Sequence, residues 1–176
     1  MPSFSYFPII KTTDAELRAY LELADSVKNG LLPVFELTRS RRSKKNPHGD
    51  IRKRIKSLVA GAERRPFILD LTTEGTLQNA QIEEMLGAGG KGFSEWVSFI
   101  RELKEAELNP IPVVHFEPSL PDEMRAEVKG LRRHSTLMAF RVKIDEEAAE
   151  LTRLVAREVG AENLIVILDG GFIKPD

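Results

Sequence analysis

The segment PFILDL, residues 66–71, decides how we interpret the fold of this chain. It is an apolar run that is interrupted near its end by one acid, Asp70. Runs of this kind are typical of strands that are covered on both faces, as in a parallel sheet. Similar runs occur at residues 6–11, 31–37, 111–117, 136–143 and 164–169. We therefore expect six strands.

The stretches between these runs change to the helical period. Apolar residues recur every three or four positions in residues 14–28, 51–62, 94–105, 121–133 and 146–159. We expect Asp14 to cap the first of these helices and Gly160 to end the last. Strands that alternate with amphipathic helices predict an α/β fold with a mostly parallel sheet. Such a fold is either a doubly wound sheet or a (β/α) barrel.

Length and composition agree with one ordinary globular domain over residues 1–176. Apolar residues make up 41% of the chain and charged residues 30%. The chain has no cysteine, which excludes disulfides and thiolate sites, and its three histidines make a multi-histidine zinc site improbable. No signal peptide or membrane-spanning run is present in the sequence, so we expect a cytoplasmic protein that does not enter a membrane.

Several of these segments together resemble the bacterial and phage "beta family" proteins. The most specific part is YFPIIK (6–11) followed by AELRAYLELADSVKNGLLPVFEL (15–37), and PFILDL, PVVHF, FRVKI and LIVILDGG repeat the family's pattern of strands that end in a polar residue. The resemblance implies a (β/α)₈, TIM-barrel-like fold, of which this chain would supply about six units, the N-terminal half to two-thirds. It also implies a phage or antiviral-defence context, but no particular activity.

A barrel with six of its eight units leaves an open sheet edge at residues 164–168. We expect a further part of the chain, a protein partner or a second copy of the chain to cover this edge.

Every expected strand ends in ionisable residues. At this end of a parallel sheet loops vary freely, and reactive groups collect there. Four acids are hard oxygen ligands that suit Mg²⁺ or Mn²⁺: Glu36, Asp70, Glu117 and Asp169. Glu36, Asp70 and His115 are candidate catalytic residues, and Lys11 and Arg141 could hold a phosphate. The alternative is structural: the same charges form ion pairs that seal the sheet end, and no short metal-binding motif is present.

The segment from Arg39 to Lys56 contains nine basic residues against one acid, Asp50. Its net charge is +8, and since the whole chain carries −1, the remainder carries −9. A loop of this kind binds the backbone of DNA or RNA, and the candidate contacts are Arg39, Arg41, Arg42, Lys44 and Lys45. No aromatic residue lies among them, which argues against base stacking. A solvated loop without a ligand is the alternative.

These patterns predict a beta family protein that binds a phosphate-containing or nucleic-acid partner at the carboxyl ends of its strands. A noncatalytic protein-interaction module and a metal-dependent phosphodiester hydrolase are the two alternatives. Whether the protein is an enzyme is left open by the sequence.

Overall fold

The computed structural model describes residues 4–62, 65–87, 92–145 and 147–170. Six strands all run parallel to their neighbours: β1 Ile9–Lys11, β2 Val34–Leu37, β3 Phe67–Leu71, β4 Pro110–Pro112, β5 Met138–Lys143 and β6 Leu164–Asp169. They form a four-stranded sheet in the order β1-β2-β3-β4 and a pair β5-β6. A single parallel bridge, Val113 to Ala139, connects the two groups. The α/β class with a parallel sheet is confirmed, but no closed barrel exists among the described residues.

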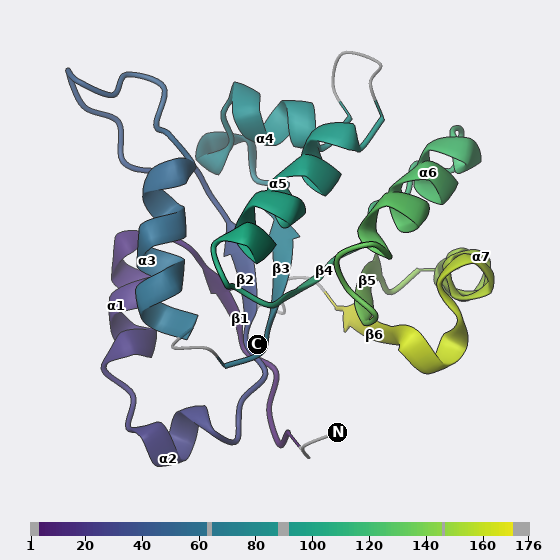
Figure 1. The fold of residues 1–176 in the computed structure, drawn as a ribbon, viewed down its shortest axis with the longest axis horizontal. Helices are drawn as coiled ribbons and strands as arrows, with labels where there is room; N and C mark the ends of the chain where they lie inside the picture. The colour runs from purple at the N-terminus through teal and green to yellow at the C-terminus, as the bar shows by residue number, and fades with distance from the viewer. Residues whose placement is uncertain (1–3, 63–64, 88–91, 146, 171–176) are drawn as a thin grey trace, which may run out of the picture.

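Helices connect the strands (Figure 1). They are α1 Asp14–Leu21, α2 Asp25–Lys28, α3 Arg52–Ala62, α4 Ala80–Met85, α5 Ser94–Glu105, α6 Pro121–Leu131 and α7 Ala148–Val159, with short 3₁₀ turns η1 Gly75–Leu77 and η2 Ala161–Asn163. The predicted helix 14–28 is in fact two helices, and Thr13 rather than Asp14 caps the first of them. Gly160 does end α7, with φ +86°. Helix α4 was not predicted. None of the helices in the described residues is long and apolar enough to cross a membrane.

Two of the strands are shorter than predicted, and prolines lie at or beside them. The N-terminal run begins pairing regularly only at Ile9, after Pro8, which has no N–H to donate. In the fourth run, Pro110–Pro112 pairs with β3, and the chain then turns toward β5, where Val114 N donates to Ala139 O at 2.7 Å. The strand predicted at 111–117 therefore does not extend to His115 or Glu117.

The two faces of the sheet have different coverings. One face packs against the helices and carries Phe35, Leu69 and Phe140 together with Trp96 of α5. The other face carries a second cluster, to which strand and loop residues but no described helix contribute: Leu32, Val34, Ile68, Ile111, Val113 and Ala139. A doubly wound sheet has helices on both faces. Here the helices lie on one face, and the sheet curves so that residues of the other face, which we call the inner face, bury one another.

Both edges of this curved sheet are partly exposed. Tyr6, Phe7 and Ile9 at the β1 edge are 63%, 48% and 43% exposed. At the β6 edge, Val166 and Leu168 are 40% and 63% exposed, and β5 is the only described strand paired with β6. The edge expected at residues 164–168 is therefore present in the part of the chain that the structure describes.

Candidate functional site

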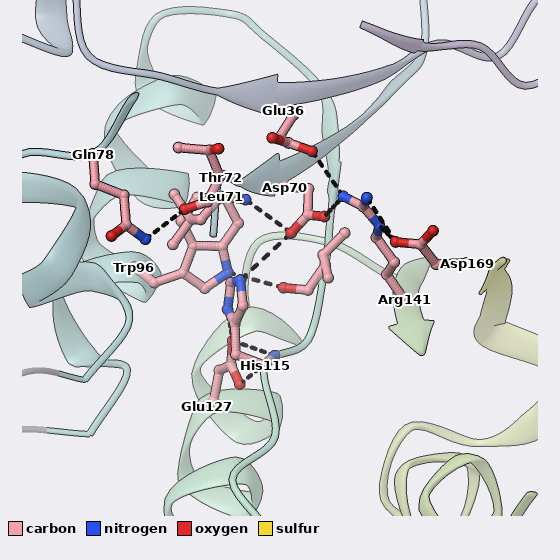
Figure 2. A network of polar contacts seen from close by, with 11 residues as sticks. Glu36, Asp70, Leu71, Thr72, Gln78, Trp96, His115, Glu127, Arg141 and Asp169 are labelled. Atoms are coloured by element: carbon pink, nitrogen blue, oxygen red, sulfur yellow. Dashed lines mark hydrogen bonds and ion pairs between the residues drawn. The ribbon is translucent and has the colours of Figure 1, made fainter. Parts of the chain in front are cut away.

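Four ionisable residues meet at the carboxyl ends of the strands, with Arg141 at their centre (Figure 2). Arg141 Nη1 donates to Glu36 Oε2 at 2.9 Å and to Asp70 Oδ2 at 3.1 Å. Its Nε and Nη2 reach Asp169 Oδ2 at 3.0 and 2.8 Å. One guanidinium from β5 thus joins carboxylates of β2, β3 and β6. The structure brings together the four residues that the sequence placed at neighbouring strand ends.

Strand register explains this convergence. Glu36 and Asp70 are direct neighbours across the β2–β3 pair, and Val34 and Ile68, two residues earlier, pair in the same way. Because alternate residues of a strand share a face, each acid continues an apolar row of the inner face. Arg141 follows Ala139 of that same face. The inner face therefore has buried apolar layers with a charged layer on top.

His115 extends the network from the segment that follows β4. Its Nε2 lies 3.7 Å from Asp70 Oδ1, an ion-pair distance that is longer than a hydrogen bond, while Asp70 Oδ1 accepts from Leu71 N at 2.8 Å. On its other side, His115 Nδ1 lies 3.0 Å from Glu127 Oε1, and the His115 main-chain N donates to both oxygens of Glu127. The imidazole is thus held between two carboxylates.

Burial and charge oppose one another at His115. Burial alone lowers its pKa, but the close contacts with Asp70 and Glu127 and the electrostatic attraction of these two carboxylates reverse this effect and raise the pKa to about 9. The ring stacks on Phe93 with its centroid 5.5 Å away, an arrangement that suits a cation, and lies at 76° to the ring of Trp96, whose centroid is 5.3 Å away. Burial raises the pKa of Glu127, against the lowering effect of His115. At neutral pH His115 is therefore an imidazolium.

Glu127 is the member of the network that the sequence reasoning missed. It lies on α6 with a fully buried side chain. The helix turns its apolar positions Met124, Val128 and Leu131 toward the core, and Glu127 falls within that stripe. An acid on the apolar stripe of a helix is visible in the sequence, and it predicts a buried partner, since a buried carboxylate requires one.

A cavity of about 450 Å³ lies beside this network. Its apolar wall includes Phe93, Phe116 and Phe140. Among the described residues, its ionisable lining consists of four acids and three bases: Asp70, Glu117, Asp145, Asp169, His115, Arg141 and Lys143. Glu36 and Glu127 add two further carboxylates that contact this lining. Carboxylates therefore outnumber cations around the cavity, an arrangement that repels a phosphate group.

The remaining strand-end candidates lie apart from Arg141. Lys11 pairs with Glu74, whose carboxylate is the main cause of the raised pKa of Lys11. Glu117 is exposed and accepts a hydrogen bond from Ser119. Among the described residues, no group of three or more histidines and acids is placed to hold a metal ion. Of the four acids predicted as Mg²⁺ or Mn²⁺ ligands, Glu36, Asp70 and Asp169 contact the guanidinium of Arg141.

The basic segment begins in the loop between β2 and α3, residues 38–51, which we call the basic loop. The loop extends away from the body of the molecule (Figure 1). Its base is held by main-chain contacts: Asn79 Nδ2 donates to Gly49 O, and Arg39 Nη2 donates to Thr76 O at 2.8 Å. Gly49 has φ +72°, and a Cβ there would lie 2.4 Å from Ser40 O. The two sides of the loop therefore touch at its base.

The predicted phosphate contacts of this segment fall into two groups. Arg39 fixes the loop through main-chain carbonyls, as does Arg54 of α3, which is buried, pairs with Asp14 and donates to Arg39 O. At the tip, by contrast, four cations are exposed and make no ion pair with another described residue: Arg41, Arg42, Lys44 and Lys45. A tight turn closed by paired hydrogen bonds between Ser43 and Asn46 holds this tip together. The tip thus presents unneutralised positive charge to solvent.

Comparison with known proteins gives a family but no structural relative. A family profile described as Beta protein matches residues 6–175. "Protein beta" of Enterobacteria phage P4 is 27% identical over 175 residues, which cover 98% of this chain and 46% of that protein. The chain therefore spans about half the length of this curated relative. No solved structure matches the chain.

Proposed function

Because this chain belongs to the Beta protein family, which has a member in a phage, we propose that it binds the phosphate backbone of a nucleic acid through the tip of the basic loop. The observation that carries the proposal is the charge of the tip. Arg41, Arg42, Lys44 and Lys45 are exposed, and no described carboxylate pairs with them. Backbone phosphates are the partners that such a group of cations attracts most strongly.

The tip is a better candidate than the cavity beside Arg141. Each N–H-bearing nitrogen of Arg141 is within hydrogen-bond distance of a carboxylate, and Lys11 is engaged by Glu74. A phosphate at the strand ends would have to compete with these carboxylates at close range. At the tip of the basic loop it would meet cations alone.

The composition of the basic loop suggests how it binds. It has no aromatic residue on which a base could stack, and its basic side chains are long and flexible. Contacts of this kind fix a protein on the backbone without reading the bases. We therefore expect weak dependence on base sequence and strong dependence on salt.

The test is the salt dependence of binding to a short duplex of random sequence, measured by fluorescence anisotropy. Each phosphate contact contributes roughly 0.9 to the slope of log affinity against log salt concentration. Replacing Arg41, Arg42, Lys44 and Lys45 by alanine should reduce the slope by up to about 3 to 4.

A matched control removes four exposed cations from helices elsewhere: Arg18, Lys129, Arg153 and Arg157. Both variants change the net charge equally, so a general effect of charge would alter both slopes alike. The proposal is wrong if the loop variant keeps the wild-type slope, or if the control variant loses as much.

We also propose that the curved sheet is part of a (β/α) barrel, completed by two further βα units between β6 and β1. Sequential parallel order, helices on one face and a buried inner face support this proposal. So do the exposed apolar side chains at both edges, such as Ile9 and Leu168. In such a closed barrel, the amides of β1 and β6 should exchange hydrogen as slowly as those of β3. Rapid exchange at both edges would reject a closed barrel.

A role in antiviral defence is a further proposal that rests on the family resemblance. It predicts that cells carrying this protein restrict phage growth in a plaque assay and that cells carrying the loop variant do not. Equal restriction by both proteins would show that defence does not depend on the basic loop.

A further inference from the structure

A second group of basic side chains, without a carboxylate partner among the described residues, lies at the opposite end of the sheet. A groove of about 410 Å³ runs between the α5–β4 connection and the α6–β5 connection, at the amino ends of the strands. We call it the basic groove, because the four ionisable residues that line it in the described part of the chain are all basic: Lys104, Arg132, Arg133 and His134. No acid among the described residues lines it, in contrast to the cavity beside Arg141.

Two of these cations are positioned by neutral acceptors. Lys104 Nζ donates to Asn109 Oδ1 at 2.7 Å, and Arg132 Nη2 donates to the main-chain oxygen of Glu158. The carboxylate of Glu158 itself is engaged by Arg125. Hydrogen bonds of this kind restrict a side chain without cancelling its charge. Lys104 and Arg132 are thus held in place while their charge stays available to a ligand.

The end of α6 does not cancel this positive charge. A helix C-terminus is usually negative, because its last carbonyl groups lack donors. Here Val128 O accepts from Arg132 N, Gly130 O from Arg133 N, and Leu131 O from the main-chain N of both His134 and Ser135. The carbonyl oxygens nearest the groove are therefore occupied by the turn that follows the helix.

The rest of the lining is neutral. Ser135 and Thr136 provide hydroxyls near the cations, and Ser135 Oγ is fixed by donation to Leu137 O at 2.6 Å. Pro66, Pro110, Ile111 and Leu137 form an apolar floor. The volume lies within the usual range of small-molecule sites. A ligand that fits this lining has an anionic group at one end and an apolar body at the other.

We propose that the basic groove binds a phosphate-bearing small molecule of nucleotide size, with its phosphate held by Lys104, Arg132 and Arg133. The groove lies at the strand ends opposite the basic loop, so the proposal does not depend on nucleic-acid binding by that loop. The recognised chemistry is a phosphate ester. A free nucleotide and the terminal phosphate of an oligonucleotide both carry it, and the experiment separates them.

The probes are AMP, inorganic phosphate and adenosine, titrated into the wild-type protein by isothermal calorimetry. AMP should bind saturably and adenosine should not. The double variant Lys104→Ala/Arg133→Ala should weaken AMP binding by at least about tenfold, because it removes two charge-assisted contacts. The matched control Arg101→Ala/Lys129→Ala removes one exposed cation from each of α5 and α6, outside the groove, and should leave the affinity within about twofold.

Absence of saturable AMP binding would overturn the proposal, as would equal weakening by both double variants or equal affinity for adenosine. A 5′-phosphorylated oligonucleotide that competes with AMP more strongly than its unphosphorylated form would identify a nucleic-acid end as the source of the phosphate. The basic-loop variant should bind AMP normally. A loss of AMP binding in that variant would show that AMP binds at the basic loop and would contradict a site in the basic groove.

Discussion

Replacement of Arg141 by methionine tests whether the strand-end network holds the sheet together. The substitution keeps an unbranched side chain but removes the guanidinium. Glu36 and Asp70, each with a side chain that is 7% exposed, would then lose their shared cation. Asp169, which is 21% exposed, would lose the same partner but remain nearer to solvent. Two buried carboxylates at neighbouring positions of β2 and β3 would be left facing one another.

The expected loss follows from burial. Removing one partner of a fully buried ion pair costs about 3 to 5 kcal/mol, because the other charge stays desolvated and unpaired. Arg141 itself is 24% exposed, so water screens part of the interaction. We therefore expect the free energy of unfolding to fall by about 2 to 3 kcal/mol. This is a large share of the roughly 5 to 15 kcal/mol that stabilises a typical domain.

Urea denaturation followed by the fluorescence of Trp96 measures this loss. Trp96 is the only tryptophan, is fully buried, and donates to Val113 O at 3.0 Å, close to the network. Adding Glu36→Gln and Asp70→Asn to Arg141→Met should recover at least about half of the stability, since the unpaired charges are then gone. A loss below about 0.5 kcal/mol in the single variant, or no recovery in the triple variant, would refute the reasoning.

Three further predictions concern neighbouring features. The folded pKa of His115, about 9, lies above the ordinary value of 6.5, so the stabilisation by His115 is complete below pH 6.5 and is lost as pH rises through 9, by up to about 3 kcal/mol. In urea denaturation, the wild type should therefore exceed His115→Gln in stability by more at pH 6 than at pH 10. The same difference at both pH values would contradict this prediction. Gly130→Ala should lower the free energy of unfolding by about 1 to 2 kcal/mol, because the new Cβ would lie 2.8 Å from Val97 Cγ1. Adding Val97→Ala should restore part of this loss. An unchanged melting temperature of Gly130→Ala would show that α5 and α6 shift apart without cost. Because Arg141 already binds the acids, Mn²⁺ should raise the melting temperature of wild type no more than that of Asp70→Asn, whereas selective stabilisation of wild type would favour the predicted metal site.

The sequence was sufficient to predict the acids at the ends of β3 and β6, but not the partners of their charges. PFILDL and LIVILD each place an acid after an apolar row, so alternation along the strand decides the face on which Asp70 and Asp169 lie. Whether those acids bind a metal or an arginine depends on which side chains reach them from other strands. Arg141 lies 71 residues after Asp70 in the sequence, so no local sequence pattern predicts the contact between them.

The same limit applies to the helices and to the basic segment. Helix α4 has only the residues AQIEEM, too few to show a helical period. Arg39 and Arg54 look like the other cations of their segment, yet they bind main-chain oxygens and Asp14. Charge counts cannot distinguish a cation that fixes a loop from one that is available to a ligand. The difference lies in the acceptors that each side chain reaches in the fold.

This difference decides where an anion can bind. Of the three bases that line the cavity at the strand ends, Arg141 and His115 are bound by carboxylates that outnumber them. Their charge therefore stabilises the fold and is unavailable to a ligand phosphate. The cations of the basic loop have no carboxylate partner among the described residues, and two of those in the basic groove are fixed by neutral acceptors. Anion binding by this protein should consequently survive Arg141→Met under conditions in which that variant remains folded, and disappear only when the loop or the groove is changed.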